Sequence, residues 1–403
     1  MKNKFPLNMS TRHFHDDVHG HFAWMRQEAP IYKAKLTRWA DAYLITRYDD
    51  VVDALKDPRI VKNPANAKPK TGKRSGIWMP KMFETLQNNM LNSDEPDHRR
   101  LRNLVHKAFT PRMITGLEPQ IQQIADQLLD RALTEKDFDL IEAFALPLPI
   151  NVIAEMIGIP QADRASFFKL TTSIIVTPTP FNMVKAIPSI SRYLKYIQKL
   201  AEKRRADPQD DLMTALVQAQ DGDDRFTDEE VQAMAFLLLV AGHETTVNLI
   251  ANGALALMTH PDQMAQLRAD PALMDGAVEE LLRYDGPLQT TEYSYASEDI
   301  TLHDVTIPQG AQIFPALMSA NRDEQAFSNA DELDITRTPN RHMAFGHGIH
   351  YCLGAPLARM EGQIAFNTLL DRAPDLRLNT SVENIRYRTV PMLRRLDALP
   401  VVV

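Results

Sequence analysis

Apolar residues recur at helical spacing along most of the chain, and only short runs alternate as strands do. The spacing predicts long helices over residues 96–109, 113–134, 142–157, 162–176, 183–206, 226–258, 273–284 and 355–372. Strand-like runs lie near the C-terminus and at residues 42–47, 290–295, 299–302 and 311–314. Because no repeat, low-complexity segment or clear linker interrupts this pattern, we expect a mainly α fold with small β-sheets, in which residues 1–403 form a single domain.

The segment from about 226 to 258 is longer than a typical globular helix. Its middle, Ala233 to Ala241, is apolar on all faces and should therefore cross the core. The residues from Gly242 to Thr246 then interrupt this apolar stretch. A glycine inside a helix costs about 1 kcal/mol relative to alanine, and buried Glu and Thr side chains need hydrogen-bond partners. We therefore expect a local opening or polar channel here; the alternative is a helix that becomes exposed after Gly242.

Charge and cysteine content exclude several classes of protein and of metal site. The formal net charge is −7 and the pI is about 6.0, whereas nucleic-acid binders normally carry a basic surplus. A single cysteine excludes an intrachain disulfide and every metal site built from several cysteines. Residues 1–6 lack an apolar signal core, and the apolar run from Met234 to Ala241 is far short of the roughly 20 residues that span a bilayer. We expect a soluble cytoplasmic protein with neither nucleic acid nor a membrane as partner.

The one cysteine, Cys352, lies in the glycine-rich stretch 345–354 (the Cys loop), just before a helical segment with Pro356 in its first turn. A sulfur held there by backbone N–H groups and a helix N-terminus is stabilised as a thiolate, which suits the axial ligand of a haem iron. One alternative is a small core residue. Another is a cysteine hydrolase with His347 or His350 as base, although nucleophile and base usually come from distant segments.

Phe345, Gly348, Cys352 and Gly354 have a spacing that resembles the haem-binding signature of the cytochrome P450 family. The resemblance runs from about residue 20 to residue 400 and is to the soluble bacterial type. It implies the fold of that family, with haem b between the long central helix (about 226–258) and the Cys-loop helix, Cys352 as the iron ligand and O2 as co-substrate. The positions that it assigns to haem binding are His98, Arg102, Ala241, Thr245, His342, Phe345, His350, Cys352 and Gly354.

The stretch from Ala241 to Thr246 resembles the oxygen-activation stretch of the family's central helix, and by that resemblance Glu244 and Thr245 form an acid–alcohol pair. The chemistry agrees with this role, because splitting dioxygen consumes two protons. A hydroxyl can hydrogen-bond the bound oxygen, and a carboxylate connected to water can relay protons. A polar patch at a helix end is the alternative interpretation.

Two further pairs resemble family motifs. Glu280 and Arg283 match a Glu-x-x-Arg motif, which puts both side chains on one helix face and which in the family is a buried pair that braces the Cys loop. His98 and Arg102 also share a helix face, and two cationic donors match the two carboxylates of haem. The alternatives are an exposed ion pair, which contributes little, and a solvated basic face.

The chain departs from the family at two places. The family often has an arginine that binds a propionate on the strand after the Glu-x-x-Arg helix, and Ser294 occupies that position here. Neutralisation of the propionates is then less complete, or another group supplies it. The family also commonly has an Arg-Phe pair that completes the brace, where this chain has Glu332 and Leu333. Either this brace is built differently, or the local alignment slips by a residue or two.

The resemblance implies a monooxygenase that inserts one oxygen atom into a small apolar organic substrate. The stretches expected to contact that substrate are 73–89, 167–184, Val240 and 288–291. Their bulky residues are Trp78, Met79, Met82, Phe83, Phe167, Phe168 and Phe181. These suggest a polyketide, terpenoid, steroid or fatty acyl compound, although Met and aromatic residues often belong to an ordinary core.

Electrons are expected from a separate ferredoxin or flavodoxin with its reductase, because no dinucleotide-binding Gly-x-Gly-x-x-Gly pattern occurs in the chain. An acidic donor would favour a basic patch, for which Arg100, Lys107 and Arg112 are candidates.

The alternative function is a haem-thiolate protein that does not oxygenate: an isomerase, dehydratase, peroxygenase or haem sensor. The Glu244–Thr245 pair argues against it.

Overall fold

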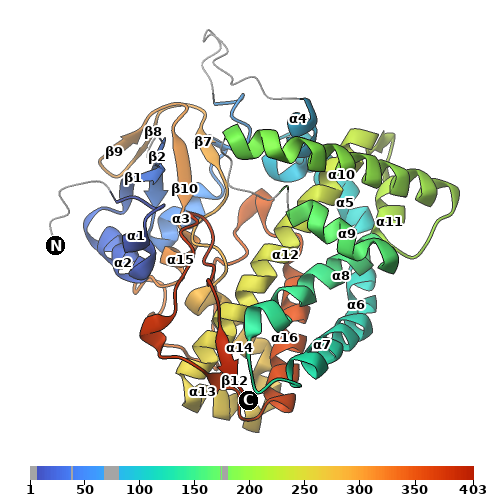
Figure 1. Cartoon of the computed structure of the whole chain (residues 1–403). Helices are drawn as coiled ribbons and strands as arrows, with labels where there is room; N and C mark the ends of the chain where they lie inside the picture. Colours follow the sequence, from blue (N-terminus) through green and yellow to red (C-terminus); the bar gives the residue numbers. More distant parts are fainter. Residues whose placement is uncertain (1–6, 38–39, 68–80, 173, 175–179) are drawn as a thin grey trace. The chain divides into compact units, whose positions relative to one another are not determined.

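The structure, a computed structural model, describes residues 7–37, 40–67, 81–172, 174 and 180–403. It divides into two compact units, each assembled from stretches that are far apart in the sequence (Figure 1). The first unit comprises residues 1–72, 125–147 and 245–403, and the second unit comprises residues 73–124 and 148–244. A single domain over residues 1–403 stays a prediction.

The helices of the first unit come from both ends of the chain. Its α-helices are α1 (Arg12–Asp16), α2 (Val18–Glu28), α3 (Tyr48–Ala54), α13 (Pro261–Ala269), α14 (Met274–Asp285), α15 (Leu317–Ala320) and α16 (Ala355–Arg372). Its short helical turns are the π-helix η2 (Ile141–Ala145) and the 3-10 helices η3 (Pro271–Leu273), η4 (Gly348–His350) and η5 (Val382–Asn384). Helices α14 and α16 pack together. A Cβ at Gly362 of α16 would lie 3.2 Å from the Cδ2 of Leu249 and 3.4 Å from a methyl of Val278 on α14, so a larger residue would crowd Leu249 first.

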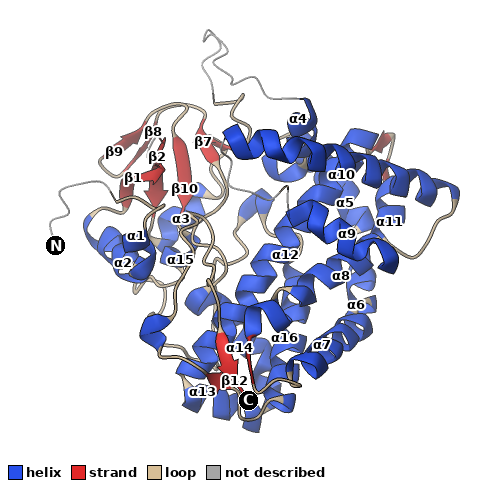
Figure 2. Cartoon of the chain, viewed as in Figure 1, coloured by secondary structure: helices blue, strands red, loops and turns tan. Residues whose placement is uncertain are grey.

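The strands of the first unit form small sheets (Figure 2). They are β1 (Ile31–Thr37), β2 (Ala40–Ile45), β3 (Ile60–Val61), β4 (Asp137–Asp139), β7 (Ser294–Ala296), β8 (Ile300–Leu302), β9 (Val305–Ile307), β10 (Gln312–Pro315), β11 (Arg377–Leu378) and β12 (Pro400–Val402). The largest sheet has the order β1-β2-β10-β7-β3, with β10 parallel to β2 and the other neighbours antiparallel. Strands β11, β12 and β4 form a second sheet, and β8 pairs with β9.

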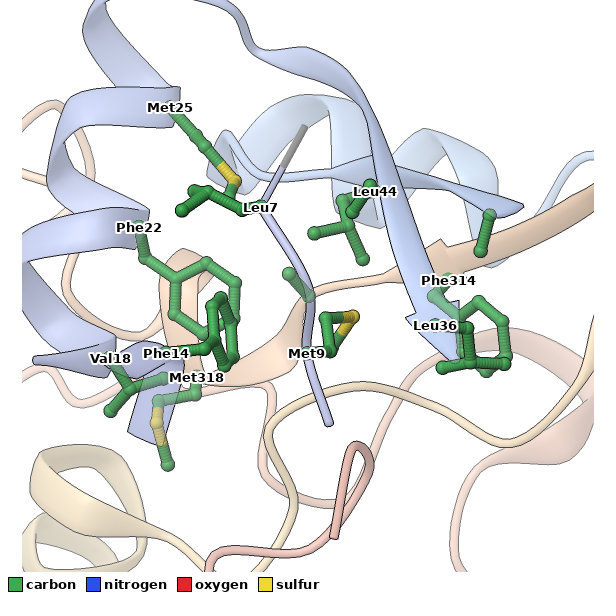
Figure 3. Close-up of a cluster of buried hydrophobic side chains, with 13 residues drawn as sticks. Leu7, Met9, Phe14, Val18, Phe22, Met25, Leu36, Leu44, Phe314 and Met318 are labelled. Atoms are coloured by element: carbon green, nitrogen blue, oxygen red, sulfur yellow. The ribbon is translucent and has the colours of Figure 1, made fainter. Parts of the chain in front are cut away.

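A buried apolar cluster joins the N-terminal helices to this five-stranded sheet (Figure 3). Met9, Phe14, Phe22 and Leu44 are all fully buried in it. The rings of Phe14 and Phe22 meet edge to face with their centroids 5.7 Å apart, an arrangement that adds about 0.5–1.5 kcal/mol beyond the burial of area. Phe314 on β10 belongs to the same cluster, so the core fixes the strands beside β7.

The described part of the second unit is helical apart from one hairpin (Figure 2). Its elements are α4 (Lys81–Gln87), η1 (Met90–Asn92), α5 (Asp97–Ala108), α6 (Pro111–Gly116), α8 (Pro147–Ile157), α9 (Gln161–Thr172), α10 (Pro180–Ala206), α11 (Leu212–Gln218), β5 (Gln220–Asp221) and β6 (Asp224–Arg225). Two helices are shared by the units. These are α7 (Glu118–Ala132) and α12 (Asp228–Thr259), and α12 passes from the second unit to the first after Glu244.

Helix α12 is α-helical along its whole length, so the distortion expected after Ala241 does not occur. Gly242 serves helix packing instead. A Cβ at Gly242 would stand 2.8 Å from the Cδ1 of Ile153 on α8, closer than side chains normally approach.

By length and composition α12 could span a membrane, as could the bent pair 141–157 and 161–171 if counted as one span. However, 61% of the most apolar window of α12 is buried inside the protein, and the core helix of a globular protein passes the same test.

Most predicted helices are present within a few residues of their expected bounds, and α16 has the bounds that the sequence predicts. One helix over 113–134 was a wrong prediction, because the chain forms α6 and α7 with a break at Leu117. Pro119, in the first turn of α7, suits the start of a new helix. The strand predicted over 290–295 is also wrong in its first half. Thr291 donates its N–H to the carbonyl of Pro315, and ladder pairing with β10 begins only at Ser294.

Candidate active site

The loop that carries Cys352 is closed by its own backbone. The Cys352 N–H donates to the carbonyl oxygen of Phe345 at 3.0 Å. Gly346 and Gly348 have φ angles of +70° and +71°, a conformation that favours glycine. At Gly348 a Cβ would also stand 2.5 Å from the carbonyl oxygen of Leu55, so the loop and the end of α3 are in close contact. These constraints fix the position of Cys352.

The sulfur of Cys352 lies just before α16 and is neither fully buried nor fully exposed. Gly354 is the N-cap of this 18-residue helix, and its carbonyl accepts the N–H of Ala358 at 2.9 Å. A helix N-terminus stabilises an anion, so it favours the thiolate. A Cβ at Gly354 would lie 3.9 Å from the sulfur, an ordinary van der Waals distance. One thiolate donor on a fixed loop fits the axial ligation of haem.

Glu279 on α14 connects the Cys loop to α16. Its carboxylate accepts hydrogen bonds from Arg359 at 2.7 and 2.8 Å and from Nε2 of His342 at 3.2 Å. The Arg359 guanidinium also lies over the ring of Phe345, 4.5 Å from its centroid. Burial alone would raise the pKa of the Glu279 carboxyl, but the bonds from Arg359 and His342 hold this pKa at about 2. Sequence reasoning missed Glu279 and Arg359, because their roles depend on how α14 packs against α16.

His342 was predicted to contact a propionate. In the structure its Nδ1 accepts the N–H of Ala344 at 3.1 Å, so Nε2 carries the ring proton and donates to Glu279. Both ring nitrogens are therefore engaged with protein groups, and in this arrangement His342 braces the Cys loop. Its contact with a propionate stays a prediction that requires one of these bonds to open. His350 ends η4, two residues before Cys352.

The pair of Glu280 and Arg283 is buried, as predicted. Both side chains are fully inaccessible to solvent, and Arg283 donates to the two carboxylate oxygens at 2.7 and 2.8 Å. The remaining N–H groups of Arg283 bond to the carbonyl oxygens of Asn321, Ala330 and Glu332 at 2.7–2.9 Å. The pair thereby holds the segment that leads to the Cys loop.

Arg337 completes this brace. Its Nε lies 3.2 and 3.1 Å from the two carboxylate oxygens of Glu280. Glu332 contributes only its carbonyl oxygen, which accepts from Arg283 and Arg337, while its carboxylate accepts from Asn329. The second arginine of the brace is therefore residue 337, and Glu332 is not in its place. The sequence did contain a signal for this arrangement: an arginine, Arg337, lies a few residues after Glu332 in the segment before the Cys loop.

In the second unit, His98 and Arg102 lie one turn apart on α5. His98 is buried, and burial, followed by the charge of Arg102, lowers the pKa of its imidazole. The neutral ring could donate one N–H to a carboxylate, and Arg102 would supply the charge. Arg100 forms an ion pair with Glu230. The haem contacts of His98 and Arg102 stay a prediction.

Ala241, Glu244 and Thr245 are spaced i, i+3 and i+4, so they share one face of α12. Ala241 is exposed although most of the apolar helix before it is buried, and Glu244 and Thr245 are partly exposed. An accessible strip on an otherwise buried helix is suited to contact a flat ligand.

The predicted substrate stretches are only partly described. Trp78 and Met79 lie outside the described residues. Phe167 is 2% exposed, and its ring packs against the rings of Tyr193 and Tyr196, with centroids 6.0 and 5.4 Å away. Phe167 is therefore a core residue, the alternative that the sequence had left open.

Comparison with known proteins identifies the family. The model of the cytochrome P450 family matches residues 2–373. Cytochrome P450 107B1 of Saccharopolyspora erythraea is 45% identical over 390 residues, which are 96% of this chain and 95% of that protein. The structure of PksS, the cytochrome P450 of the bacillaene polyketide synthase of Bacillus subtilis, matches with a TM-score of 0.91 and 42% identity over 98% of each chain. The chain belongs to the cytochrome P450 family. The myxobacterial cytochrome P450 CYP267B1, solved with myristic acid, matches with a TM-score of 0.90 and 40% identity over 98% of each chain.

Membership of this family gives the fold and the class of reaction. The chain has the cytochrome P450 fold and is a monooxygenase, an oxidoreductase that uses haem b as cofactor and O2 as co-substrate. The family acts on apolar substrates and takes electrons from redox partners.

Proposed function

We propose that the protein is a cytoplasmic haem-thiolate monooxygenase in which Cys352 holds the iron. The observation that carries this proposal is the fixed position of the only cysteine, on a loop closed by its own backbone and followed at once by α16. Glu279 and Arg359 support the loop from α14 and α16. When bound, the haem supplies the activation of O2, while the protein positions the substrate and controls access of protons.

The accessible strip of α12 would supply the groups that handle the co-substrate and the protons. The Thr245 hydroxyl would donate a hydrogen bond to O2, and the Glu244 carboxylate would relay protons from water. Ala241, which has the smallest side chain of the strip, would help to hold the haem, as would Gly354 and Phe345.

The names of two relatives support a substrate with a long apolar chain. PksS belongs to a polyketide synthase, and CYP267B1 was solved with myristic acid. We propose that this protein hydroxylates a polyketide or fatty acyl compound. A library screen for the spin-state change on substrate binding would test this choice, and binding of steroids alone would contradict it.

A ferredoxin or flavodoxin with its reductase would supply the electrons. Ile349 and Tyr351 on the Cys loop are 49% and 39% exposed, which gives a partner an apolar contact close to the thiolate. Of the basic candidates, Arg112 is exposed, whereas Lys107 is exposed but paired with Asp221 at 3.7 Å. Arg100 is less suited because Glu230 binds it.

The ligand assignment is tested by the spectrum of the reduced carbon-monoxide complex. The wild-type protein should give the red-shifted band of a thiolate haem, and Cys352→His should lose that band while it still binds haem. Tyr351→Phe, next to the ligand, is the matched control and should keep the band. A thiolate band in Cys352→His would show that another group binds the iron.

A further inference from the structure

Helix α10 is strongly basic in a chain whose formal net charge is −7. Glu202 is its only acidic residue, whereas a lysine or arginine occurs in every turn from Arg192 onwards. The helix packs against α9 and α11 within the second unit (Figure 1). The residues that it buries, among them Tyr193, Ile197 and Leu200, are spaced three and four apart. The opposite face is therefore left to solvent.

Four cations form a row on this solvent face. Arg192, Lys195, Lys199 and Lys203 are all exposed, and their spacings of three and four residues place them on one side of the helix. The row extends over about 16 Å along the helix axis. Lys185, two turns before Arg192, is exposed on the same side.

The protein does not balance this row with carboxylates of its own. Among the residues that the structure describes, the four side chains form no ion pair, whereas Arg205 of the same helix binds Asp228 at 2.5 Å. The carboxylates beside the row are engaged elsewhere. Glu202 accepts from Gln198, and Asp163 of α9 accepts from a tyrosine of α10, each at 3.0 Å. Like charges in a row repel one another, and an anionic partner would relieve that repulsion.

The row lies on the helix that follows the expected substrate contacts. The sequence assigns residues 167–184 to substrate contact, and α10 begins inside that stretch, at Pro180. The rings of Phe167 and Tyr193 pack with their centroids 6.0 Å apart, which fixes α10 against α9. A partner bound along the row would therefore lie close to the segment that is expected to receive the substrate.

The row fits an acidic protein better than an anionic membrane. Helices that lie on a membrane combine cations with apolar side chains that enter the lipid. Of the side chains of α10 that the structure describes, no large apolar one is exposed. A purely charged row can still bind carboxylates of a protein partner, where such contacts speed association and fix orientation.

We propose that the row on α10 docks a small acidic protein that carries the substrate as an acyl thioester. The inference rests on the substrate class proposed above, because a fatty acyl or polyketide chain has a carboxyl end through which a carrier can hold it. The electron donor would be a different partner, which would meet Ile349 and Tyr351 on the Cys loop.

The test compares two ligands of the holoprotein, a myristoyl-loaded acyl carrier protein and free myristic acid. Binding is followed by the spin-state change of the haem and, independently, by calorimetry. Lys195→Glu combined with Lys199→Glu should weaken binding of the loaded carrier about tenfold, because each reversal replaces an attraction by a repulsion. Binding of the free acid should stay at the wild-type level. Added salt should weaken carrier binding more in the wild-type protein than in this variant.

Two matched variants separate the position of the charge from its amount. Arg131→Glu combined with Lys136→Glu changes the net charge equally at exposed positions of the first unit, so both ligands should bind as they do to the wild-type protein. Lys195→Arg combined with Lys199→Arg keeps the charge of the row and should also bind both ligands normally.

Wild-type affinity of the Lys195→Glu, Lys199→Glu protein for the loaded carrier would overturn the inference. An equal loss of free-acid binding would overturn it too, because the pocket itself would then be damaged. Slower reduction by the electron donor, or lost binding to phosphatidylglycerol vesicles, with carrier binding unchanged, would assign the row to another partner and likewise refute the inference.

The wild-type protein distinguishes this inference from the proposed function. If it bound free myristic acid but not the loaded carrier, the inference would fail and the proposed function would stand. If it bound neither ligand and steroids alone, the proposed substrate class would fail as well.

Discussion

Substitution of Glu279 by Gln tests how strongly the brace of the Cys loop stabilises the protein. The change keeps the shape of the side chain but removes the charge that Arg359 and His342 bind. The folded-state pKa of about 2, against an ordinary 4.5, corresponds to about 3 kcal/mol. Because the Glu279 side chain is 27% exposed, solvent screening reduces the expected effect to about 1–2 kcal/mol at pH 7.

The pH dependence gives a second, independent test of the same prediction. The pKa of Glu279 is lower in the folded protein than in the unfolded chain, so its contribution is complete above about pH 4.5 and is lost as the pH falls towards 2. The difference in free energy of unfolding between the wild-type protein and Glu279→Gln should therefore be constant from pH 7 to pH 6. It should shrink as the pH is lowered through 4.

The assay is urea unfolding of the holoprotein, followed by tryptophan fluorescence and by the haem absorption band at each pH. Glu298→Gln is the control, because Glu298 is 62% exposed and lies 3.9 Å from the nearest guanidinium nitrogen of Arg59. It should be neutral throughout. A Glu279→Gln protein with wild-type stability at pH 7, or with a stability deficit that does not change with pH, would refute the electrostatic account of this brace.

Further substitutions at Arg283, Arg337, Gly242 and Thr245 have defined outcomes. Arg283→Met should lower the free energy of unfolding by about 3–5 kcal/mol, because it leaves the buried Glu280 carboxylate with one guanidinium partner. Arg337→Met should lower it by less, because the bidentate pair of Glu280 and Arg283 remains. Equal effects of the two substitutions in urea unfolding would be inconsistent with this ranking. Gly242→Val should lower the free energy of unfolding by about 1–3 kcal/mol, because the new side chain overpacks against Ile153. Adding Ile153→Ala should recover part of this loss, and a double-mutant cycle measures the interaction between the two positions. Thr245→Ala should release peroxide and form less product per electron consumed; unchanged coupling of electrons to product would remove Thr245 from the proton relay.

Local signals explain what the sequence predicts well. Helix α16 begins and ends where expected, because Gly354 and Pro356 mark its first turn and the apolar spacing continues to Arg372. The buried pair of Glu280 and Arg283 was also predictable, since a spacing of three on one helix brings the two side chains together. In each case the deciding residues are neighbours in the chain.

Contacts between distant segments explain what the sequence did not predict. Gly242 looked like a break in a core helix, and its purpose becomes clear only beside Ile153 of α8. Glu279 looked like an ordinary helix residue until packing of α14 against α16 brought Arg359 to it. The strand expected from Thr290 begins only at Ser294, because the N–H groups of Gln289 and Thr291 bond to Met392 and to Pro315 and do not form a continuous ladder.

The arginine of the brace has a physical explanation. A buried charge needs a partner at a position in space, and the chain can supply that partner from any segment that reaches it. Arg337 reaches the buried carboxylate of Glu280, while residue 332 contributes a carbonyl oxygen. A motif compared position by position records a loss at residue 332, whereas the geometry supplies a cation within bonding distance of Glu280. The Arg337→Met protein therefore tests whether position in space, and not position in the motif, decides this brace.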